Sequence, residues 1–487
     1  MSLQANAVSF QAPRKPKEEA TLIARLDRIP VWSFPHLSIG IIGLGFFFTF
    51  FDIGDINVSF IQTCTQIVPG CLPETASRYM ALPVLLNLFG YMVGALALSP
   101  LADRFGRRDM IVVSMGITGL GSLYTAFVGS YANFILARIL TGIGIGADIA
   151  FVSTYIAEIA PSRERAKYTS LIFIMAMLGM SVAVWLGLYL TTPPAPFPFG
   201  LPFALATPHF VIGWRIMYGI GAWFPLVGVL LRSFALPESP RWLVSQGRLS
   251  EAERVVSNME RQALIHIKEL PAIAFTPSIS AIANHTGYRA IFGHRLYLKR
   301  TIILLVIWLL GYMAVYSIVT GMTVLLTALG YSASEAGLIT AIGVVGYLAS
   351  GLITYLFAER LERKYWLLIS AIVVLVGSML IAMSRSDFGV TVSGCIVLGL
   401  GVNLWVPLIY AWSAENYPAR ARTTGFALVD GVGHIGGGIG MSYVIVLILR
   451  VGPFGAFIMM GCFLLIAAWL AQFGPNTRDK RLDEVAP

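Results

Sequence analysis

Charged residues are scarce in this sequence. Asp, Glu, Lys and Arg make up only 12% of its 487 residues, whereas a soluble domain carries about 25% because its surface faces water. The chain is instead 57% hydrophobic, with a mean hydropathy of +0.76. So few charges cannot cover a water-facing surface, and most of the protein's area must therefore face lipid. The composition excludes an ordinary soluble protein.

Cysteine is scarce as well. Only four cysteines are present, too few for a disulfide framework. Cys64 and Cys71 fall in one predicted outer loop. They leave two alternatives, which are two free thiols or a disulfide formed in an oxidising compartment.

Motifs that carry catalysis are missing. The sequence has no metal-ligand spacing, no nucleophile elbow and no phosphate-binding P-loop. We therefore expect neither an enzyme nor an ATP-driven pump, and no cofactor or metal site. The polar, Pro/Lys-rich residues 1–37 also contain no short apolar core typical of a cleavable signal peptide. We expect this N-terminal segment to stay in the cytoplasm.

Apolar runs long enough to cross a bilayer, about 20 residues each, recur along the chain in two sets of six. They lie at 38–61, 79–101, 109–129, 132–157, 168–191 and 211–233, and at 300–322, 335–358, 365–384, 388–412, 424–449 and 452–473. We predict an all-α polytopic membrane protein with twelve transmembrane helices. Its predicted parts are a cytoplasmic segment 1–37, a six-helix half 38–233, a cytoplasmic linker 234–299, a second half 300–473 and a cytoplasmic tail 474–487.

The formal charge of +9 gives the orientation. Lys and Arg collect in short cytoplasmic loops of membrane proteins, and here they follow every second predicted helix. The predicted inner loops hold Arg104, Arg107, Arg108, Arg163, Arg165, Lys167, Arg360, Arg363, Lys364, Arg420 and Arg422, whereas the outer loops hold only Arg78, Arg385 and Arg450, with Arg215 at a helix edge. We expect both termini in the cytoplasm of a cell whose inner membrane holds the protein, and no nucleic-acid partner.

The two halves echo each other in sequence. Residues 101–108 after the second predicted helix resemble 358–364 after the eighth, and 157–165 after the fourth resemble 414–422 after the tenth. Repeated halves with matched cytoplasmic loops are typical of carriers whose halves rock about a central site.

These loops carry a resemblance to the major facilitator superfamily over nearly the whole chain. Asp103-Arg104-Phe105-Gly106-Arg107-Arg108 is similar to the superfamily's signature after its second helix. Residues 237–243 (Pro-Glu-Ser-Pro-Arg-Trp-Leu) and, more loosely, 473–477 resemble the sugar-porter branch. The resemblance implies the major facilitator fold, a small-molecule substrate carried by alternating access, and a monomer in the bilayer.

The sequence predicts a different class of substrate from that of the sugar porters. Their fifth and seventh helices usually carry glutamines that bind hydroxyl groups, but 168–191 and 300–322 contain none. Residues 142–148 (Gly-Ile-Gly-Ile-Gly-Ala-Asp) instead resemble metabolite–proton symporters, whose substrates include aromatic acids, niacin and other small organic ions. We expect a secondary active transporter of an organic acid or similar organic ion, rather than a sugar, in symport with protons.

Charges inside the predicted helices mark functional positions, because an ionised side chain in a bilayer is costly. The resemblance assigns proton coupling to Asp52 and Arg138, and Asp55 shares the helix face of Asp52 three residues on. A permanent ion pair that only locks two helices together is the alternative. Candidates for the substrate cavity are Asp148, Asn403, Trp405, Asp430 and His434.

Each cavity candidate has a structural alternative. Asp148 can pair with a neighbouring donor, and His434 can be a core group whose hydrogen bonds are satisfied. For Trp412 we prefer a position facing lipid or headgroups to one in the cavity.

The cytoplasmic motifs predict a latch that holds the outward-facing state. We expect Asp103 to bond the N-terminal amides of the next helix, Gly106 to belong to the same signature, and Arg104, Arg107 and Arg108 to bridge to Glu158. Within the loops, we expect Glu158 to pair with Arg163 or Arg165, and Glu415 with Arg420 or Arg422. The first-half latch should be the stronger, because Glu359 and Glu362 replace the usual Asp-Arg pair in the second. A signal for topology alone is the alternative.

Two other functions fit the same fold. One is a non-transporting nutrient sensor, although such sensors usually add long cytoplasmic tails and the tail here is short. The other is a proton-antiport exporter of organic cations, which buried carboxylates would suit.

Overall fold

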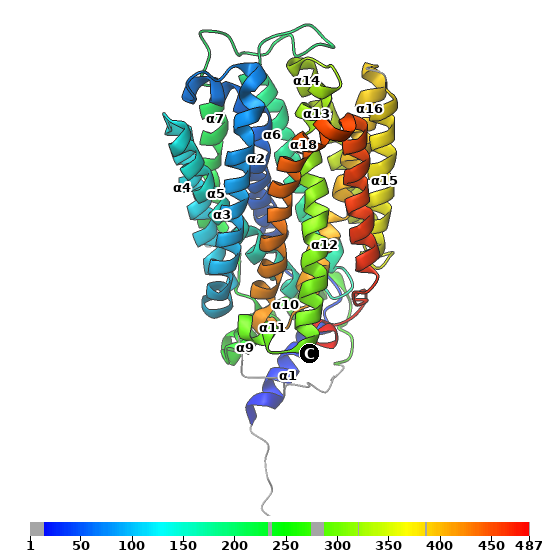
Figure 1. Cartoon of the computed structure of the whole chain (residues 1–487). Helices are drawn as coiled ribbons and strands as arrows, with labels where there is room; N and C mark the ends of the chain where they lie inside the picture. The colour runs from blue at the N-terminus through cyan, green and yellow to red at the C-terminus, as the bar shows by residue number, and fades with distance from the viewer. Residues whose placement is uncertain (1–13, 232–235, 274–286, 320, 385–386, 487) are drawn as a thin grey trace, which may run out of the picture.

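The computed structural model describes residues 14–231, 236–273, 287–319, 321–384 and 387–486. The first thirteen residues of the predicted N-terminal segment, part of the predicted linker, and Arg385 lie outside the described residues. Within them the chain forms one elongated bundle of long helices (Figure 1).

Helices α2 to α8 form what we call the N-terminal half, and helices α12 to α18 the C-terminal half. The first contains α2 (His36–Ile67), α3 (Ala76–Phe105), α4 (Arg107–Phe127), α5 (Tyr131–Ile159), α6 (Arg165–Thr191), α7 (Gly213–Ile220), η2 (Gly221–Trp223) and α8 (Phe224–Leu230). The second contains α12 (Arg295–Val319), α13 (Met322–Ala328), α14 (Ala333–Phe357), α15 (Arg363–Met383), α16 (Phe388–Leu404), α17 (Val406–Glu415) and α18 (Arg422–Ala471).

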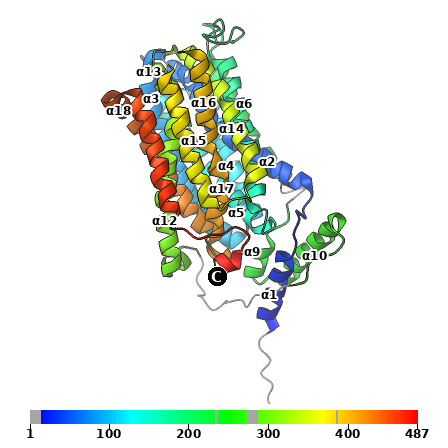
Figure 2. The same cartoon turned by 90° about the vertical axis from the view of Figure 1, so that its right-hand side faces the viewer.

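The helices that belong to neither half gather at one end of the bundle. They are α1 (Arg14–Asp27), α9 (Pro240–Ser245), α10 (Leu249–His266), α11 (Tyr288–Phe292) and α19 (Leu482–Val485). Figures 1 and 2 place α1, α9 and the C-terminus at this same end. By the distribution of basic residues, this end is the predicted cytoplasmic face.

The predicted transmembrane helices are present, with two differences in form. Ten helices of the described residues are long and apolar enough to cross a membrane. The predicted sixth, 211–233, is broken into α7, η2 and α8, with Pro225 in the first turn of α8, where no amide hydrogen bond is lost. The eleventh and twelfth run together as α18 across a kink at Gly452, where φ is 73°. With these two, the predicted twelve-helix architecture is confirmed.

Glycines allow the helices of the N-terminal half to pack closely. A Cβ atom on Gly142 or Gly146 of α5 would lie 2.1 Å from the carbonyl oxygen of Asn87 or Tyr91 in α3. Such contacts are shorter than any side chain permits, so only glycine fits there. Between the halves, α3 packs against α18 and α6 packs against α14.

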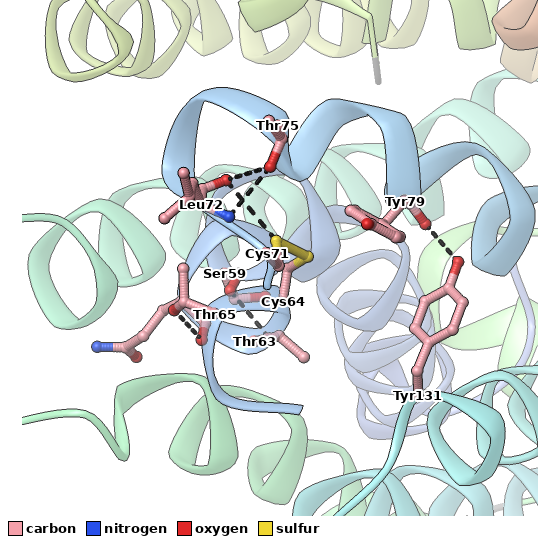
Figure 3. The surroundings of a disulfide bond; sticks show 10 residues. Ser59, Thr63, Cys64, Thr65, Cys71, Leu72, Thr75, Tyr79 and Tyr131 are labelled. Carbon is pink, nitrogen blue, oxygen red and sulfur yellow. Dashed lines mark hydrogen bonds between the residues drawn. A yellow bond between two sulfur atoms is a disulfide. The ribbon is translucent and has the colours of Figure 1, made fainter. Parts of the chain in front are cut away.

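The structure decides between the two alternatives for the outer-loop cysteines. Cys64, near the end of α2, and Cys71, in the loop that follows, are joined by a disulfide (Figure 3). The bond joins the last turn of α2 to the loop that follows, and α2 runs away from the face that carries α1.

Candidate functional site

Asp52 and Arg138 meet inside the N-terminal half. Arg138 donates from Nη1 to Asp52 Oδ2 at 3.2 Å, and from Nη2 to the Asp52 carbonyl oxygen at 3.2 Å. Ser122 of α4 donates to Asp52 Oδ1 at 2.9 Å. Both charged side chains are buried, and a buried pair with additional hydrogen bonds is costly to break. The sequence-predicted pair is therefore formed.

Asp55 lies beside this pair without a donor. Neither of its carboxylate oxygens has a hydrogen-bond partner among the described residues, although the side chain is only 1% exposed. Its backbone carbonyl accepts the Ser59 hydroxyl at 2.6 Å, and the Ser59 oxygen lies 3.3 Å from the Tyr218 hydroxyl of α7. A buried carboxylate without a donor is costly when ionised, which makes Asp55 a candidate for carrying a proton.

The Asp52 cluster belongs entirely to one half. Its members come from α2, α4 and α5, with Tyr218 of α7 lying 5.5 Å from the Arg138 guanidinium. A rigid-body movement of the N-terminal half would carry all of them together.

Asp148 points into the same half rather than to the boundary between halves. Thr49 of α2 and Ser114 of α4 donate to its two oxygens, each at 3.2 Å. The alternative of pairing with neighbouring donors is therefore what the structure contains.

Asp430 and His434 lie where the two halves meet. Tyr91 of α3 donates its hydroxyl to Asp430 Oδ2 at 2.6 Å, so that this bond joins the halves. The His434 ring lies between Tyr91, at 3.8 Å between ring centroids, and Tyr312 of α12, at 4.1 Å. The predicted cavity candidates of α18 therefore face an aromatic group drawn from both halves.

Trp405 extends this aromatic group. Its ring lies 6.0 Å from Tyr312 and 6.1 Å from Trp308, and its buried indole Nε1 has no hydrogen-bond partner in the part of the chain that the structure describes. Asn403, in contrast, donates to Ser350 of α14 at 2.8 Å within the C-terminal half. The Trp405 indole N–H is therefore a buried donor whose acceptor the described residues do not supply.

Sequence reasoning missed the tyrosines of this group. Trp308, Tyr312 and Tyr316 repeat every four residues along α12, and this spacing puts them on one helix face. This four-residue spacing was the signal in the sequence that could have revealed them. Tyr91 has no such signal, because its partner Asp430 is 339 residues away in sequence.

The contacts of the predicted cytoplasmic latch centre on Glu158. Its Oε1 atom pairs with Arg107 at 3.2 Å and with Arg422 of the other half at 3.1 Å, while Oε2 accepts the Ser239 hydroxyl. Asp103 pairs with Arg107 at 3.0 Å. The first-half latch thus binds the second half directly.

The prediction that each glutamate pairs with an arginine of its own loop is wrong. Glu158 pairs with Arg422, and Glu415 lies 3.9 Å from Arg165 and 3.7 Å from Arg363. The pairs are exchanged because the two cytoplasmic loops face each other across the boundary between halves. The distances also make the first-half latch the tighter one.

The prediction for Asp103 is wrong in the same way. Its Oδ2 accepts from the Thr424 amide at 3.2 Å and hydroxyl at 2.6 Å, at the start of α18 rather than of the next helix. Glu359 does the equivalent for α6, accepting from the amides of Ala166 and Lys167 at 2.9 and 3.2 Å. Each half therefore caps a helix of the other.

Glu238, to which the sequence analysis gave no role, caps α4, the helix that Asp103 was predicted to cap. Its carboxylate accepts from the amides of Arg107 and Arg108 at the start of α4, at 3.1 and 3.3 Å. Burial raises the pKa of Glu238, although these amides and that of Ser239 oppose the rise. The Pro-Glu-Ser-Pro-Arg segment thus belongs to the latch.

Two further positions differ from expectation. Arg104 is exposed and lies over Phe105, 5.3 Å from the ring centroid, so its guanidinium is not part of the bridge to Glu158. Trp412 faces neither lipid nor headgroups, because it is 1% exposed and donates to the Pro475 carbonyl at 3.0 Å.

Known proteins resemble this chain along its length. The niacin transporter NiaP of Acinetobacter baylyi is 26% identical over 467 residues, which cover 95% of this chain and 99% of that one. The 4-hydroxybenzoate transporter PcaK of the same organism is 27% identical over 384 residues, 78% of each chain.

The fold also resembles a solved structure. The proton:xylose symporter XylE superposes with a TM-score of 0.72 and 22% identity, over 92% of this chain and 98% of that one. A family model described as "Sugar (and other) transporter" matches residues 38–487. The chain therefore belongs to this family of the major facilitator superfamily, and it is a multi-pass membrane transporter of small molecules rather than an enzyme.

Proposed function

We propose that the protein is a proton symporter of a small aromatic or similar organic ion, located in the inner membrane with both termini in the cytoplasm. The observation that carries the proposal is the aromatic group formed by Tyr91, Trp308, Tyr312, Trp405 and His434 between the halves. Aromatic faces bind planar rings by stacking. Neither α6 nor α12 contains a glutamine that could bind sugar hydroxyls.

The relatives support the ring-shaped substrate. Niacin and 4-hydroxybenzoate, named for two of them, are both planar rings that carry a carboxylate. In this chain the unpartnered indole N–H of Trp405 is a suitable donor for such a carboxylate. Asn403 is a further cavity candidate, whereas the contacts of Asp148 suit a structural role.

The proton site that we propose is the cluster of Asp52, Asp55 and Arg138. The Arg138 guanidinium contacts both carboxylate oxygens of Asp52. Asp55 lies three residues on along the same helix face, and among the described residues its carboxylate has no donor. A proton that enters the cluster is therefore held on this pair.

Alternating access follows from the latch. We propose that residues 38–233 and 300–473 move as two bodies linked by 234–299. The contacts of Glu158 with Arg422 and of Asp103 with Thr424 would hold the cytoplasmic side shut, and must break when it opens. No second subunit is needed for this cycle, and we propose a monomer.

Uptake into proteoliposomes tests the proposal. The substrates are niacin, 4-hydroxybenzoate, an organic cation and xylose, each with and without an inward proton gradient. We expect accumulation of an aromatic acid that requires the gradient, and loss of that requirement in Asp52→Asn. Ser114→Ala, which removes one hydrogen bond to Asp148, serves as the matched control within the same half.

Other outcomes of this assay reject the proposal. Accumulation of xylose alone would contradict the proposal of an aromatic substrate. Gradient-driven extrusion of the organic cation would favour an exporter, and binding without transport of any compound would favour a sensor.

A further inference from the structure

We propose that Asp430, together with His434, is a second proton-binding site, and that through its bond to Tyr91 it couples protonation to the separation of the two halves. The inference rests on the proposed proton symport and adds to it the contact through which the halves respond to a proton. The Asp52 cluster lies inside one half, so rocking of the halves leaves its contacts unchanged. A contact that senses both protonation and rocking must join the halves.

The Asp430 carboxylate joins the halves by a hydrogen bond. Tyr91 of α3 donates to Oδ2 at 2.6 Å, a short O–H···O hydrogen bond. Oδ1 accepts no hydrogen bond from the described residues and lies 3.3 Å from His434 Nδ1. The second oxygen is therefore open to a proton while the first is held across the boundary.

Among the described residues, the surroundings of Asp430 contain no fixed positive charge. The described titratable groups that face it are Tyr91 from α3, Tyr312 and Tyr316 from α12, Tyr410 from α17 and His434 from its own helix. Among the described residues, no arginine or lysine forms an ion pair with it. A buried carboxylate without a permanent counter-charge is costly to keep ionised, and this distinguishes Asp430 from Asp52.

His434 is held in place to share the proton. Its Nδ1 lies 2.8 Å from the Asp430 carbonyl oxygen, and because a carbonyl only accepts, Nδ1 carries the hydrogen. The ring is fixed between Tyr91 and Tyr312, whose faces also favour a positive charge on the imidazole. The imidazole of His434 therefore lies where it can share a proton with the Asp430 carboxylate.

Glycines of α18 let α3 come close enough for the contact between Tyr91 and Asp430. A Cβ atom on Gly431 would lie 2.8 Å from that of Ala95 in α3, and one on Gly438 would lie 2.5 Å from Leu85 Cδ1. On the opposite face of α18, a Cβ on Gly433 would lie 2.4 Å from Trp308 Cβ. The glycines of residues 431–440 in α18 thus allow α3 and α12 to enclose Asp430 from both sides.

The step is a reversible proton transfer with water. A proton taken from water on the open side binds Asp430 Oδ1, and the carboxylate becomes a neutral acid. A neutral acid accepts a weaker hydrogen bond from Tyr91 than the carboxylate does, so the halves separate more easily at this contact. The proton returns to water on the other side, and the ionised carboxylate binds Tyr91 again.

Distances between the halves test the inference without substrate. Spin labels at Phe105→Cys and Arg360→Cys, in a Cys462→Ser background, report the separation of the cytoplasmic ends, because both positions are exposed and Cys395 is buried. The ratio of open to closed populations should change about fivefold between acid and alkaline buffer, the difference between a charged and a neutral hydrogen bond. Asp430→Asn, a neutral isostere, should make the ratio independent of pH.

Three further variants distinguish protonation at Asp430 from protonation elsewhere in the protein. Tyr91→Phe should also abolish the pH response, because the bond that transmits it is gone. Tyr131→Phe, which loses a hydroxyl bond to the Tyr79 carbonyl inside one half, should respond as the wild type does. Asp52→Asn should keep the response of the distances.

The outcomes distinguish this inference from the proposed function. A pH response that persists in Asp430→Asn or Tyr91→Phe would overturn the inference, as would a wild type whose distances ignore pH. If the distances respond as expected but no substrate accumulates under a proton gradient, the proposed symport fails while the inference stands.

Discussion

Position 106 requires glycine for two separate reasons. Its φ of 110° lies in the region that side chains rarely adopt, and a Cβ atom there would lie 2.2 Å from Glu238 Oε2. The same carboxylate caps α4 through the Arg107 and Arg108 amides. The glycine of the cytoplasmic signature therefore serves the approach of Glu238 rather than flexibility.

Gly106→Ala should lower the stability of the protein by about 1–3 kcal/mol, because of backbone strain and displacement of Glu238. The thermal unfolding midpoint in detergent measures the loss. Gly116→Ala is the matched control, since a Cβ at that helical position meets nothing within 4 Å and alanine favours a helix. Equal midpoints for the two variants would contradict this account of Gly106.

At the scale of elements, α1 is held on the cytoplasmic face by ion pairs. Arg25 and Arg28 both contact Glu260 of α10, at 2.7 and 2.8 Å, and Asp27 pairs with Arg241 of α9. Figure 2 shows α1 beside α9 and α10 at the end of the bundle. Charges from three separate segments thus fix the position of a helix whose own sequence is short and polar.

The docking of α1 should weaken in acid. Burial tends to raise the pKa of Glu260, but hydrogen bonds from Arg25 and Arg28 outweigh it and hold the pKa below its ordinary 4.5. A depressed carboxyl pKa contributes stability that is present above the unfolded value and is lost as the pH falls through the folded value. Amide hydrogen exchange in α1, corrected for its intrinsic pH dependence, should therefore accelerate below about pH 4.5.

Glu260→Gln should remove this pH dependence and accelerate exchange in α1 already at neutral pH. Glu251→Gln is the control, because Glu251 pairs with Arg248 of its own segment at the surface. Unchanged protection of α1 in Glu260→Gln would show that these ion pairs do not hold the helix.

At the scale of the whole molecule, the two latches are related but unequal. Glu158 has Arg107 and Arg422 within 3.2 Å, whereas the nearest arginines to Glu415 are 3.7 and 3.9 Å away. Removing one partner of a close buried pair leaves an uncompensated charge and costs about 3–5 kcal/mol. Closure of the predicted cytoplasmic side should therefore depend more on Glu158.

Glu158→Gln should raise the population open to the cytoplasm more than about tenfold, which corresponds to 1.4 kcal/mol, and Glu415→Gln should raise it much less. Maleimide labelling of Thr154→Cys in a Cys462→Ser background measures this, because the Thr154 hydroxyl is buried against Thr423 of the other half at 3.2 Å. A larger effect of Glu415→Gln would reverse our ranking of the latches.

The sequence alone predicted the helices, since hydropathy is a local property, while the orientation and the site residues that it suggests stay predictions. Asp52 and Arg138 form the expected pair. Which residues meet across the halves was decided only by the tertiary structure. The exchange of Glu158 and Glu415 between the loops, and the contact of Tyr91 with Asp430, depend on how two helical bodies face each other. No local pattern contains that geometry, because a membrane helix shows in its sequence that it is buried but not which neighbour buries it.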